Sequence, residues 1–387
     1  MNRRHWAHIV AAAVVAAAFA AAAPAAASTP SGAAPGALGA ARAAGGPAAS
    51  ATAYLQARAA AITAADPAAT LAPWVVAGSG LARTEAKVAE GTALRGAAFG
   101  RIAQSAACRV TVLDSQPADD GVTAVVAAHA ITTLTWQAAN GKSDVEASGV
   151  DHTMTLLRKG DAWVVAADVY SDVLKPACLE AAGASRARVR AAAHAVERAA
   201  VPLRIPQAPA SRPLWPGRQY SDILQYDRPA AQDYADTYAL SYNPTFVRFT
   251  GADCANFASQ CARGGGMPQA SGAVSSGWWY DKDGSSSPSD DTYSLSWINV
   301  TRQIGYWNTR RTDWETSAGV LSRGDFIYYD WTGDGVWDHV AVVAGTNSSG
   351  QKMIYAHTTD HYHVYWKLGY SGTKYRYARV RAQWVVV

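Results

Sequence analysis

The spacing of hydrophobic and polar residues changes along the chain. Residues 51–63 and 81–94 carry Ala, Leu, Glu and Lys with few helix breakers, which predicts two helices. The stretches that follow are rich in Val and Thr, alternate apolar with polar residues and are separated by turn sequences; they are 109–114, 122–136, 143–158 and 162–169. Helices followed by antiparallel strands predict a small α+β domain over residues 51–180.

The last part of the chain has a second pattern of this kind. Pro229–Leu240 predicts a helix with proline in its first turn, and Asp253 can cap another helix that Gly264–Gly266 ends. Phe326–Tyr329 and the segment that opens at His339 have the character of buried strands. We therefore expect a second α+β domain over residues 220–387, with a helix packed on an antiparallel sheet.

Three segments outside these domains have simple compositions. Residues 1–27 have a basic start, an apolar run and an Ala-x-Ala site, which is typical of a secretory signal peptide. Residues 28–50 are rich in Ala, Gly, Pro and Ser, and residues 181–219 form a stretch rich in Ala, Arg and Pro; both predict linkers. We expect a secreted, extracellular protein with no stable membrane insertion after signal cleavage.

Composition separates the two halves further. The net charge of +4 in 387 residues gives no basis for nucleic-acid binding. With 49% hydrophobic and 17% charged residues, the chain can bury cores and is not a disordered scaffold. Ten of 14 Trp and 16 of 18 Tyr lie at or after Trp215, whereas Ala dominates before it. Two such compositions indicate two domains of different origin.

The four cysteines divide into a predicted disulfide and two predicted thiols. Cys254 and Cys261 are seven residues apart on one predicted helix, about 10 Å along its axis. That separation exceeds the ~7 Å Cα limit for a disulfide. An exported chain permits disulfides, so elimination leaves Cys108–Cys178 as the predicted pair.

Cys254 has the position of a catalytic thiol. It lies at a helix N-terminus, where unpaired N–H groups and the helix dipole lower a thiol pKa. A thiolate needs a proton acceptor, usually His. If the turn after His339 spans Thr346–Gly350, His339 faces His357 on one side of a hairpin; a turn one residue shorter would put His357 on the other face.

A set of motifs resembles the putative amidase domain family, which is papain-like and related to the NlpC-type and CHAP cysteine peptidases and amidases. The motifs occur in the family's order and lie between Tyr220 and Val387; they include YDRPAAQDYA, DCANFASQ, GGMP, WWY, SW, GDFIYYD, DHVAVV and HTTD. The resemblance does not extend to the first domain.

This resemblance implies a papain-like cysteine amide hydrolase. Cys254 would be the nucleophile and His339 the base, with His357 as the orienting third member and Asp360 as the runner-up. Asp253, Trp279, Tyr280 and Trp337 are the residues expected to contact substrate. A zinc site at His357, Asp360, His361 and His363 lacks a second ligand pair at the usual spacing, so we expect no metal and no cofactor.

The first domain has no comparable constellation. Its segment DHTMTLLRKGDAWVVAADVYSD resembles the closing hairpin of cystatin-like domains of the nuclear-transport-factor-two type, which implies a role in binding, positioning or shielding. The whole chain predicts a secreted cysteine amidase or peptidase acting on peptide or amide substrates, with cell-wall peptidoglycan as the natural class by analogy. The alternatives are a catalytically silent wall-binding module and an acyltransferase that uses the same Cys-His pair.

Overall fold

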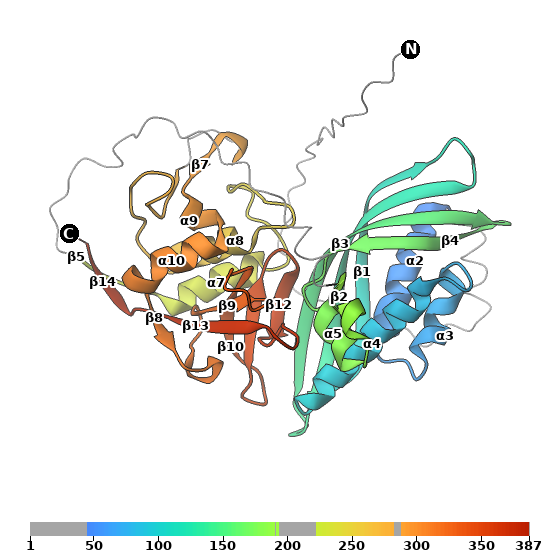
Figure 1. The fold of residues 1–387 in the computed structure, drawn as a ribbon, viewed down its shortest axis with the longest axis horizontal. Coiled ribbons are helices and arrows are strands. Elements are labelled where there is room, and N and C mark those ends of the chain that lie inside the picture. The colour runs from blue at the N-terminus through green and yellow to red at the C-terminus, as the bar shows by residue number, and fades with distance from the viewer. Residues whose placement is uncertain (1–44, 190, 193–221, 282–287, 387) are drawn as a thin grey trace, which may run out of the picture. The chain divides into compact units, whose positions relative to one another are not determined.

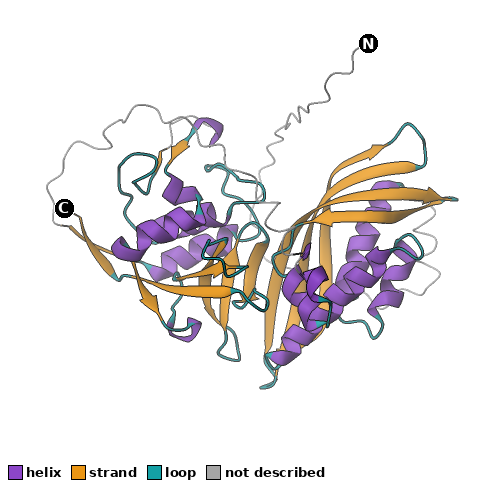
Figure 2. Ribbon diagram, in the orientation of Figure 1, coloured by secondary structure: helices purple, strands orange, loops and turns teal. Residues whose placement is uncertain are grey.

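The structure is a computed structural model that describes residues 45–189, 191–192, 222–281 and 288–386. The elements before the second linker are α2 (Pro47–Ala60), α3 (Pro67–Leu71), the 3-10 turn η1 (Ala72–Trp74), α4 (Gly80–Ala98), β1 (Arg101–Pro117), β2 (Thr123–Ala138), β3 (Ser143–Lys159), β4 (Ala162–Tyr170) and α5 (Lys175–Ala181). Figure 1 labels these elements, and Figure 2 colours them by type.

The elements after the linker are shorter. They are β5 (Asp222–Gln225), α7 (Arg228–Tyr238), α8 (Cys254–Gly264), β6 (Tyr280–Asp281), η2 (Pro288–Asp290), β7 (Thr292–Tyr293), α9 (Leu295–Ile298), α10 (Val300–Arg310), β8 (Thr312–Glu315), η3 (Ala318–Val320), β9 (Phe326–Asp330), β10 (His339–Thr346), β11 (Lys352–Ala356), β12 (Asp360–Tyr365), β13 (Lys374–Val380) and β14 (Gln383–Val386).

The first half is an antiparallel sheet with helices on one face. Strands β1, β2, β3 and β4 pair in sequence order, and α2 and α4 pack on the sheet (Figure 1). The alternation seen in the sequence puts Val126, Met154 and Val165 in one core with Tyr54 and Leu55 of α2. α2 begins at Pro47, inside the segment predicted as linker, because proline is tolerated at a first helical position.

A buried carboxylate fixes α4 against its neighbours. Glu85 is 1% exposed and accepts hydrogen bonds from Arg58, Tyr170 and Lys175. Burial alone would raise the pKa of Glu85, but the charges of Arg58 and Lys175 outweigh it and lower the pKa to about 2. The carboxylate is therefore ionised, and its charge is compensated inside the domain.

The second half is also a sheet with helices. The strand order β12-β11-β10-β9-β13-β8 is antiparallel throughout, and α8 packs on β10 and β11. One face of this sheet joins α8 in an aromatic-rich core, and the other face forms a separate cluster around Tyr329 and Ile354. β12 pairs with β3, so a continuous sheet runs through both halves.

The mixed helices and antiparallel sheets agree with the predicted α+β class. The division at the Pro-rich segment stays a prediction, as do the signal peptide and linkers, since residues 1–44 and 193–221 lie outside the described residues. Among the described residues, each half has its own main core cluster. No helix in the described part of the chain has the length and apolar character needed to cross a membrane.

The predicted Cys108–Cys178 disulfide is wrong. Both cysteines are free thiols in the structure. Cys108 lies on β1 beside the core beneath α2, whereas Cys178 lies on α5 in a different cluster with Val88 and Leu179. The elimination argument placed both residues in one domain, but it could not show that their side chains point into the same core.

Two glycines of α4 allow a test of the packing between α4 and α5. A Cβ added at Gly91 would lie 1.8 Å from the carbonyl oxygen of Cys178, whereas one added at Gly80 would meet nothing within 4 Å. Gly91→Ala should therefore destabilise the protein by about 1–3 kcal/mol, because α5 must move. Gly80→Ala, the matched control, should change stability by less than about 1 kcal/mol. Urea unfolding measures both, and equal stability of the two variants would contradict this packing.

Candidate active site

Helix α8 is buried on nearly all sides. Its first nine residues, Cys254 to Ala262, are all buried, although several are polar. Asp253 precedes the helix and is 1% exposed. Its carboxylate accepts the backbone N–H of Phe249 at 2.9 Å and the side-chain amide of Asn256 at 3.0 Å. A buried ionised carboxylate needs such donors, and it needs a cation as well.

His357 supplies that cation. It follows β11, and its Nδ1 lies 2.7 Å from the second oxygen of Asp253. Its Nε2 lies 2.8 Å from the carbonyl oxygen of Tyr238 at the end of α7. A carboxylate and a carbonyl can only accept, so both ring nitrogens donate and the imidazole is protonated. Phe257 stacks on the ring with centroids 3.9 Å apart and fixes its plane.

The pKa of His357 follows from this geometry. Burial alone would lower it, but the hydrogen bond to Asp253 and the charges of Asp360 and Asp253 raise it above the ordinary value. Asp360 makes no direct bond to the ring; it accepts the hydroxyl of Tyr242 at 2.8 Å, and burial raises its pKa. The orienting partner of His357 is therefore Asp253, which the sequence analysis had assigned to substrate contact.

Cys254 differs from the predicted low-pKa thiol. The backbone N–H groups of Val340 and Ala255 and the hydroxyl of Thr358 favour its thiolate, as the helix N-terminus does. Burial acts against them and raises the pKa of Cys254 to about 11. The expectation of a lowered pKa was wrong, because burial destabilises the thiolate more than these hydrogen-bond donors stabilise it.

His339 lies on the opposite face of the sheet from Cys254. It pairs directly with Tyr329 across β9 and β10, and its ring lies 5.5 Å from that of Tyr329 and 5.6 Å from that of Trp331. Tyr329 and Trp331 belong to the cluster behind the sheet, whereas Val340 belongs to the core that contains Cys254. The structure therefore does not bring the predicted base to the predicted nucleophile.

The reason is a shift of one residue in the hairpin. The turn spans residues 347–351, so Thr346 pairs with Lys352, and a bulge at Ala344 then places Val342 opposite Tyr355. Continued along the strands, that register puts Val340 opposite His357. The predicted facing of His339 and His357 is wrong, and His357 shares the Cys254 face instead.

The environment of His339 makes it a buried neutral residue. It is 1% exposed, its Nε2 has no hydrogen-bond partner among the described residues, and burial lowers its pKa to about 3. His361 on β12 has the same character: its pKa is lowered to about 3 by burial and by His339 nearby. Its Nδ1 lies 3.0 Å from the hydroxyl of Ser148.

Of the aromatic residues expected to contact substrate, two are structural. Trp279 is 7% exposed and donates to the carbonyl of Gly272, while Tyr280 is 3% exposed and donates to Asp291. Trp337 is half-buried and packs edge-on against Tyr328. Burial raises the pKa of Tyr328, and the charge of Cys254 adds to that rise. Trp337 alone of the three lies partly open to solvent near the Cys254 face.

Most motif residues of α8 hold other motif segments. Asn256 accepts the indole N–H of Trp297 at 3.0 Å, Ser259 accepts that of Trp278 at 3.1 Å, and Gln260 accepts the hydroxyl of Tyr234 at 2.6 Å. Sequence analysis treated these segments as an ordered list and missed their contacts. Polar residues at successive positions of a buried helix were the available signal, because each needs a partner.

No group of three or more His, Cys, Asp and Glu side chains suited to a metal ion occurs within the described ranges. Of the suspected zinc set, His357 is held by Asp253 and Tyr238, and His361 by Ser148. His363 contacts the Tyr355 hydroxyl at 2.8 Å. Asp360 accepts the Tyr242 hydroxyl, so the four residues have separate partners.

Comparison with known proteins places the C-terminal half. Residues 225–380 match the family model described as the putative amidase domain, which confirms the resemblance drawn from the motifs. The uncharacterized protein YhbB of Bacillus subtilis (strain 168) is 31% identical over 152 residues, 38% of this chain. The match spans 46% of that relative's length. At a coarse level, the family match indicates an amide hydrolase.

A solved structure also matches part of the chain. The crystal structure of the intermembrane space region of the chloroplast protein ARC6 is 12% identical and has a TM-score of 0.24. The match covers 31% of this chain and 90% of that one. This likeness is too weak to define a shared fold.

The two buried histidines should affect stability with opposite signs. The raised pKa of His357 stabilises the fold below the unfolded value of about 6.5, and that contribution disappears as pH rises through the folded pKa. The lowered pKa of His339 has the opposite effect, because the unfolded chain binds a proton at this residue more readily than the folded chain does. The stability of the fold therefore decreases as pH falls below about 6.5. His357→Gln should therefore destabilise more at pH 5 than at pH 9, and His339→Gln more at pH 7 than at pH 5. Each proton changes the free energy of unfolding by at most about 1.4 kcal/mol per pH unit. Denaturant unfolding at each pH measures these changes. The same pH dependence of destabilisation in both variants would contradict the prediction.

The pKa of Cys254 predicts how it reacts. With a pKa of about 11, the thiolate fraction should rise about tenfold per pH unit across neutrality, and alkylation by iodoacetamide should follow it. Peptide mass spectrometry at pH 7, 8 and 9 measures the rate. Cys261, fully buried on the same helix, is the internal control and should stay unlabelled. An alkylation rate that reaches its plateau below pH 7 would show that the pKa of Cys254 is far below about 11.

Proposed function

We propose that residues 220–387 form a papain-like, cysteine-dependent amide hydrolase with Cys254 as nucleophile and His357 as its proton acceptor. The observation that carries the proposal is the Asp253–His357 ion pair at 2.7 Å beside a thiol that begins a buried helix on an antiparallel sheet. The match of residues 225–380 to the putative amidase domain supports it. The role predicted for His339 passes to His357, which shares the face of Cys254.

The reaction starts from a protonated His357 and a neutral thiol. On substrate binding, the Nε2 proton of His357 passes to water as Nε2 leaves the carbonyl of Tyr238, while the Nδ1–H stays hydrogen-bonded to the Asp253 carboxylate. Nε2 then accepts the Cys254 proton as the sulfur attacks the carbonyl carbon. His357 returns that proton to the leaving amine and a thioester remains. Water attacks the thioester, releasing the acid and the thiol.

Burial of the site makes the timing of this step important. The thiolate is costly while Cys254 is enclosed, so proton transfer must accompany attack rather than precede it. The backbone N–H of Cys254 at the helix N-terminus supports the oxyanion that forms. Trp337, half-buried beside this face, is the proposed contact for the substrate.

The setting of the reaction is also a proposal. The signal-like residues 1–27 support export, and an exported enzyme would meet peptides or amides such as the stem peptides of peptidoglycan. An acyltransferase would use the same thioester with an amine in place of water. These extensions rest on the sequence and on analogy with the family.

Two observations favour a second candidate, a catalytically silent wall-binding module. The histidine that the family motif aligns with the base, His339, lies behind the sheet, and the thiol pKa is about 11. A module of this kind would keep the buried helix and its polar contacts as structure. It would bind substrate and release no amine.

Amine release from purified peptidoglycan and from a panel of peptide amides distinguishes these functions. Cys254→Ala should abolish release, and His357→Gln should lower kcat by about 10²–10⁴-fold, since it removes the proton acceptor. His339→Gln should stay within a few-fold of wild type, because its ring faces the opposite cluster. Cys261→Ser is the matched thiol control and should also remain active.

Each contrary outcome points to a specific alternative. Loss of activity in His339→Gln with full activity in His357→Gln would restore His339 as the base. No release by the wild type, together with retained binding to peptidoglycan, would establish the silent module. Product mass spectrometry with an added primary amine would detect acyl transfer as a new amide.

A further inference from the structure

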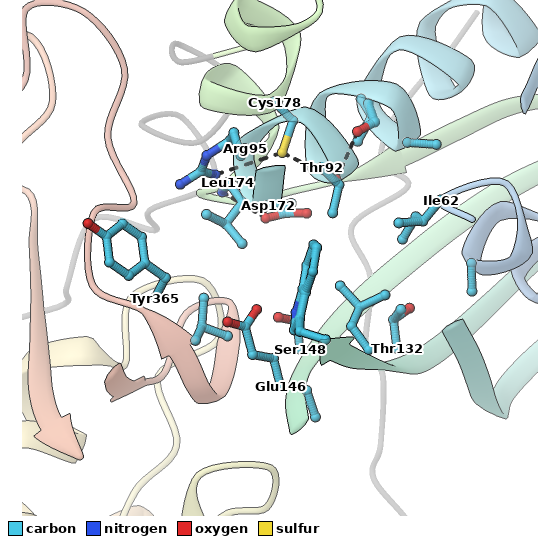
Figure 3. Close-up of a pocket in the computed structure, with 18 of the residues that line it drawn as sticks. Ile62, Thr92, Arg95, Thr132, Glu146, Ser148, Asp172, Leu174, Cys178 and Tyr365 are labelled. Atoms are coloured by element: carbon cyan, nitrogen blue, oxygen red, sulfur yellow. Dashed lines mark hydrogen bonds between the residues drawn. The ribbon is translucent and has the colours of Figure 1, made fainter. Parts of the chain in front are cut away.

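A cavity in the first half of the chain lies apart from Cys254. Its volume is about 120 Å³, and its walls come from α2, α4, the sheet strands β1, β2 and β3, α5 with the segment leading into it, and the end of β12. Figure 3 shows Arg95, Asp172 and Leu174 on one side of the open space, opposite Glu146 and Ser148, with Tyr365 at a third edge. Charged and apolar side chains thus share one small enclosure.

Two of the three carboxylates that line the cavity are neutralised by protein cations. Glu85 is held by Arg58 and Lys175. Glu146 is paired with Arg101, which is 2% exposed and lies over Trp136 at 4.9 Å. These pairs account for two of the three arginines in the lining, and the charge of Arg95 also acts on Glu146, whose pKa burial raises.

The remaining two charged residues, Arg95 and Asp172, are partly exposed and form no ion pair within the described residues. Arg95 contacts the thiol of Cys178 at 3.8 Å and the carbonyl oxygen of Lys367, but no carboxylate of the described residues lies within 4 Å of it. The carboxylate of Asp172 accepts only the backbone N–H of Leu174, at 2.8 Å, and no cation within the described ranges pairs with it. The two groups line one cavity with opposite charges and do not bond each other.

The other lining residues indicate which kind of ligand fits between Arg95 and Asp172. Arg101 is buried, and its Nε has no hydrogen-bond partner among the described residues, so one more donor is available in the lining. Val88, Leu134, Trp136 and Val150 add apolar walls. A group with a carboxylate, a nearby ammonium and a small apolar side chain complements all of these features.

We propose that this cavity binds a small α-amino acid as the zwitterion. Its carboxylate pairs with Arg95, its ammonium with Asp172, and its side chain packs on the apolar wall. Size limits the side chain: an apolar cavity of about 150 Å³ holds benzene, a molecule of six heavy atoms. A cavity of about 120 Å³ therefore takes alanine, which also has six heavy atoms, in preference to larger amino acids.

Equilibrium dialysis of the full chain against ¹⁴C-labelled L-alanine and D-alanine tests the proposal without any assay of hydrolysis. We expect saturable binding of at least one enantiomer at one site per chain. Propionate lacks the ammonium and ethylamine lacks the carboxylate, so each should compete at least tenfold more weakly than unlabelled alanine. Leucine should also compete at least tenfold more weakly, because its side chain exceeds the cavity.

Variants locate the site and its two charge contacts. Arg95→Gln and Asp172→Asn should each weaken alanine binding at least tenfold, and the amide introduced by Asp172→Asn keeps an oxygen for the Leu174 N–H. Arg109→Gln, which removes an exposed charge from β1 outside the cavity, is the matched control and should bind as wild type does. Circular dichroism verifies that the variants fold.

Three results would overturn the proposal. They are no saturable binding of either enantiomer by the wild type, competition by propionate equal to that by alanine, and unchanged binding in both charge variants. The second result would identify a carboxylate site rather than an amino-acid site. Because Cys254→Ala should bind alanine as well as wild type does, failure of this proposal and failure of the proposed hydrolase are separately measurable.

Discussion

Burial of polar side chains on α8 is the constraint on which the C-terminal half depends. A helix enclosed on nearly all sides would be apolar if packing alone decided its sequence. Here Asp253, Asn256, Ser259 and Gln260 lie in or beside it, and an unpaired buried polar group costs about 1–3 kcal/mol. Each therefore takes partners from other segments: Asp253 bonds His357, Asn256 bonds Trp297, and Ser259 bonds Trp278. The contacts that satisfy α8 also fix where β11, α7 and the Trp-rich loops lie.

The same enclosure shapes the chemistry at Cys254. A helix N-terminus favours a thiolate, yet burial raises the pKa of Cys254 to about 11. His357 is held between the Asp253 carboxylate and the Tyr238 carbonyl, so both of its ring nitrogens are occupied. Stability and reactivity are in opposition at this point. The ion pair that secures the fold must loosen, by release of the Tyr238 carbonyl, before His357 can accept a proton.

Sequence patterns predicted what depends on local composition. The helices that begin near Pro229 and Cys254, the strands at Phe326 and His339, and the family itself follow from spacing and motif order. The face of His339 does not, because one bulge at Ala344 reverses which side of the sheet a residue occupies. The Cys108–Cys178 pairing failed for a related reason. Both depend on where side chains point after packing, and sequence spacing alone contains no such information.

Charge compensation explains why the alanine cavity is distinct from its surroundings. Four buried acids of the described residues have cationic partners: Glu85 has Arg58, Glu146 has Arg101, Asp253 has His357 and Asp325 has Arg228. Two others are satisfied by hydrogen bonds instead, since Asp330 accepts backbone N–H groups and Asp360 accepts the Tyr242 hydroxyl. Arg95 and Asp172 line a single cavity without pairing to each other or to another side-chain charge of the described residues. Both residues are partly exposed, and neither forms an ion pair within the described part of the chain. A zwitterion brings both missing partners at once and keeps the net charge of the cavity unchanged.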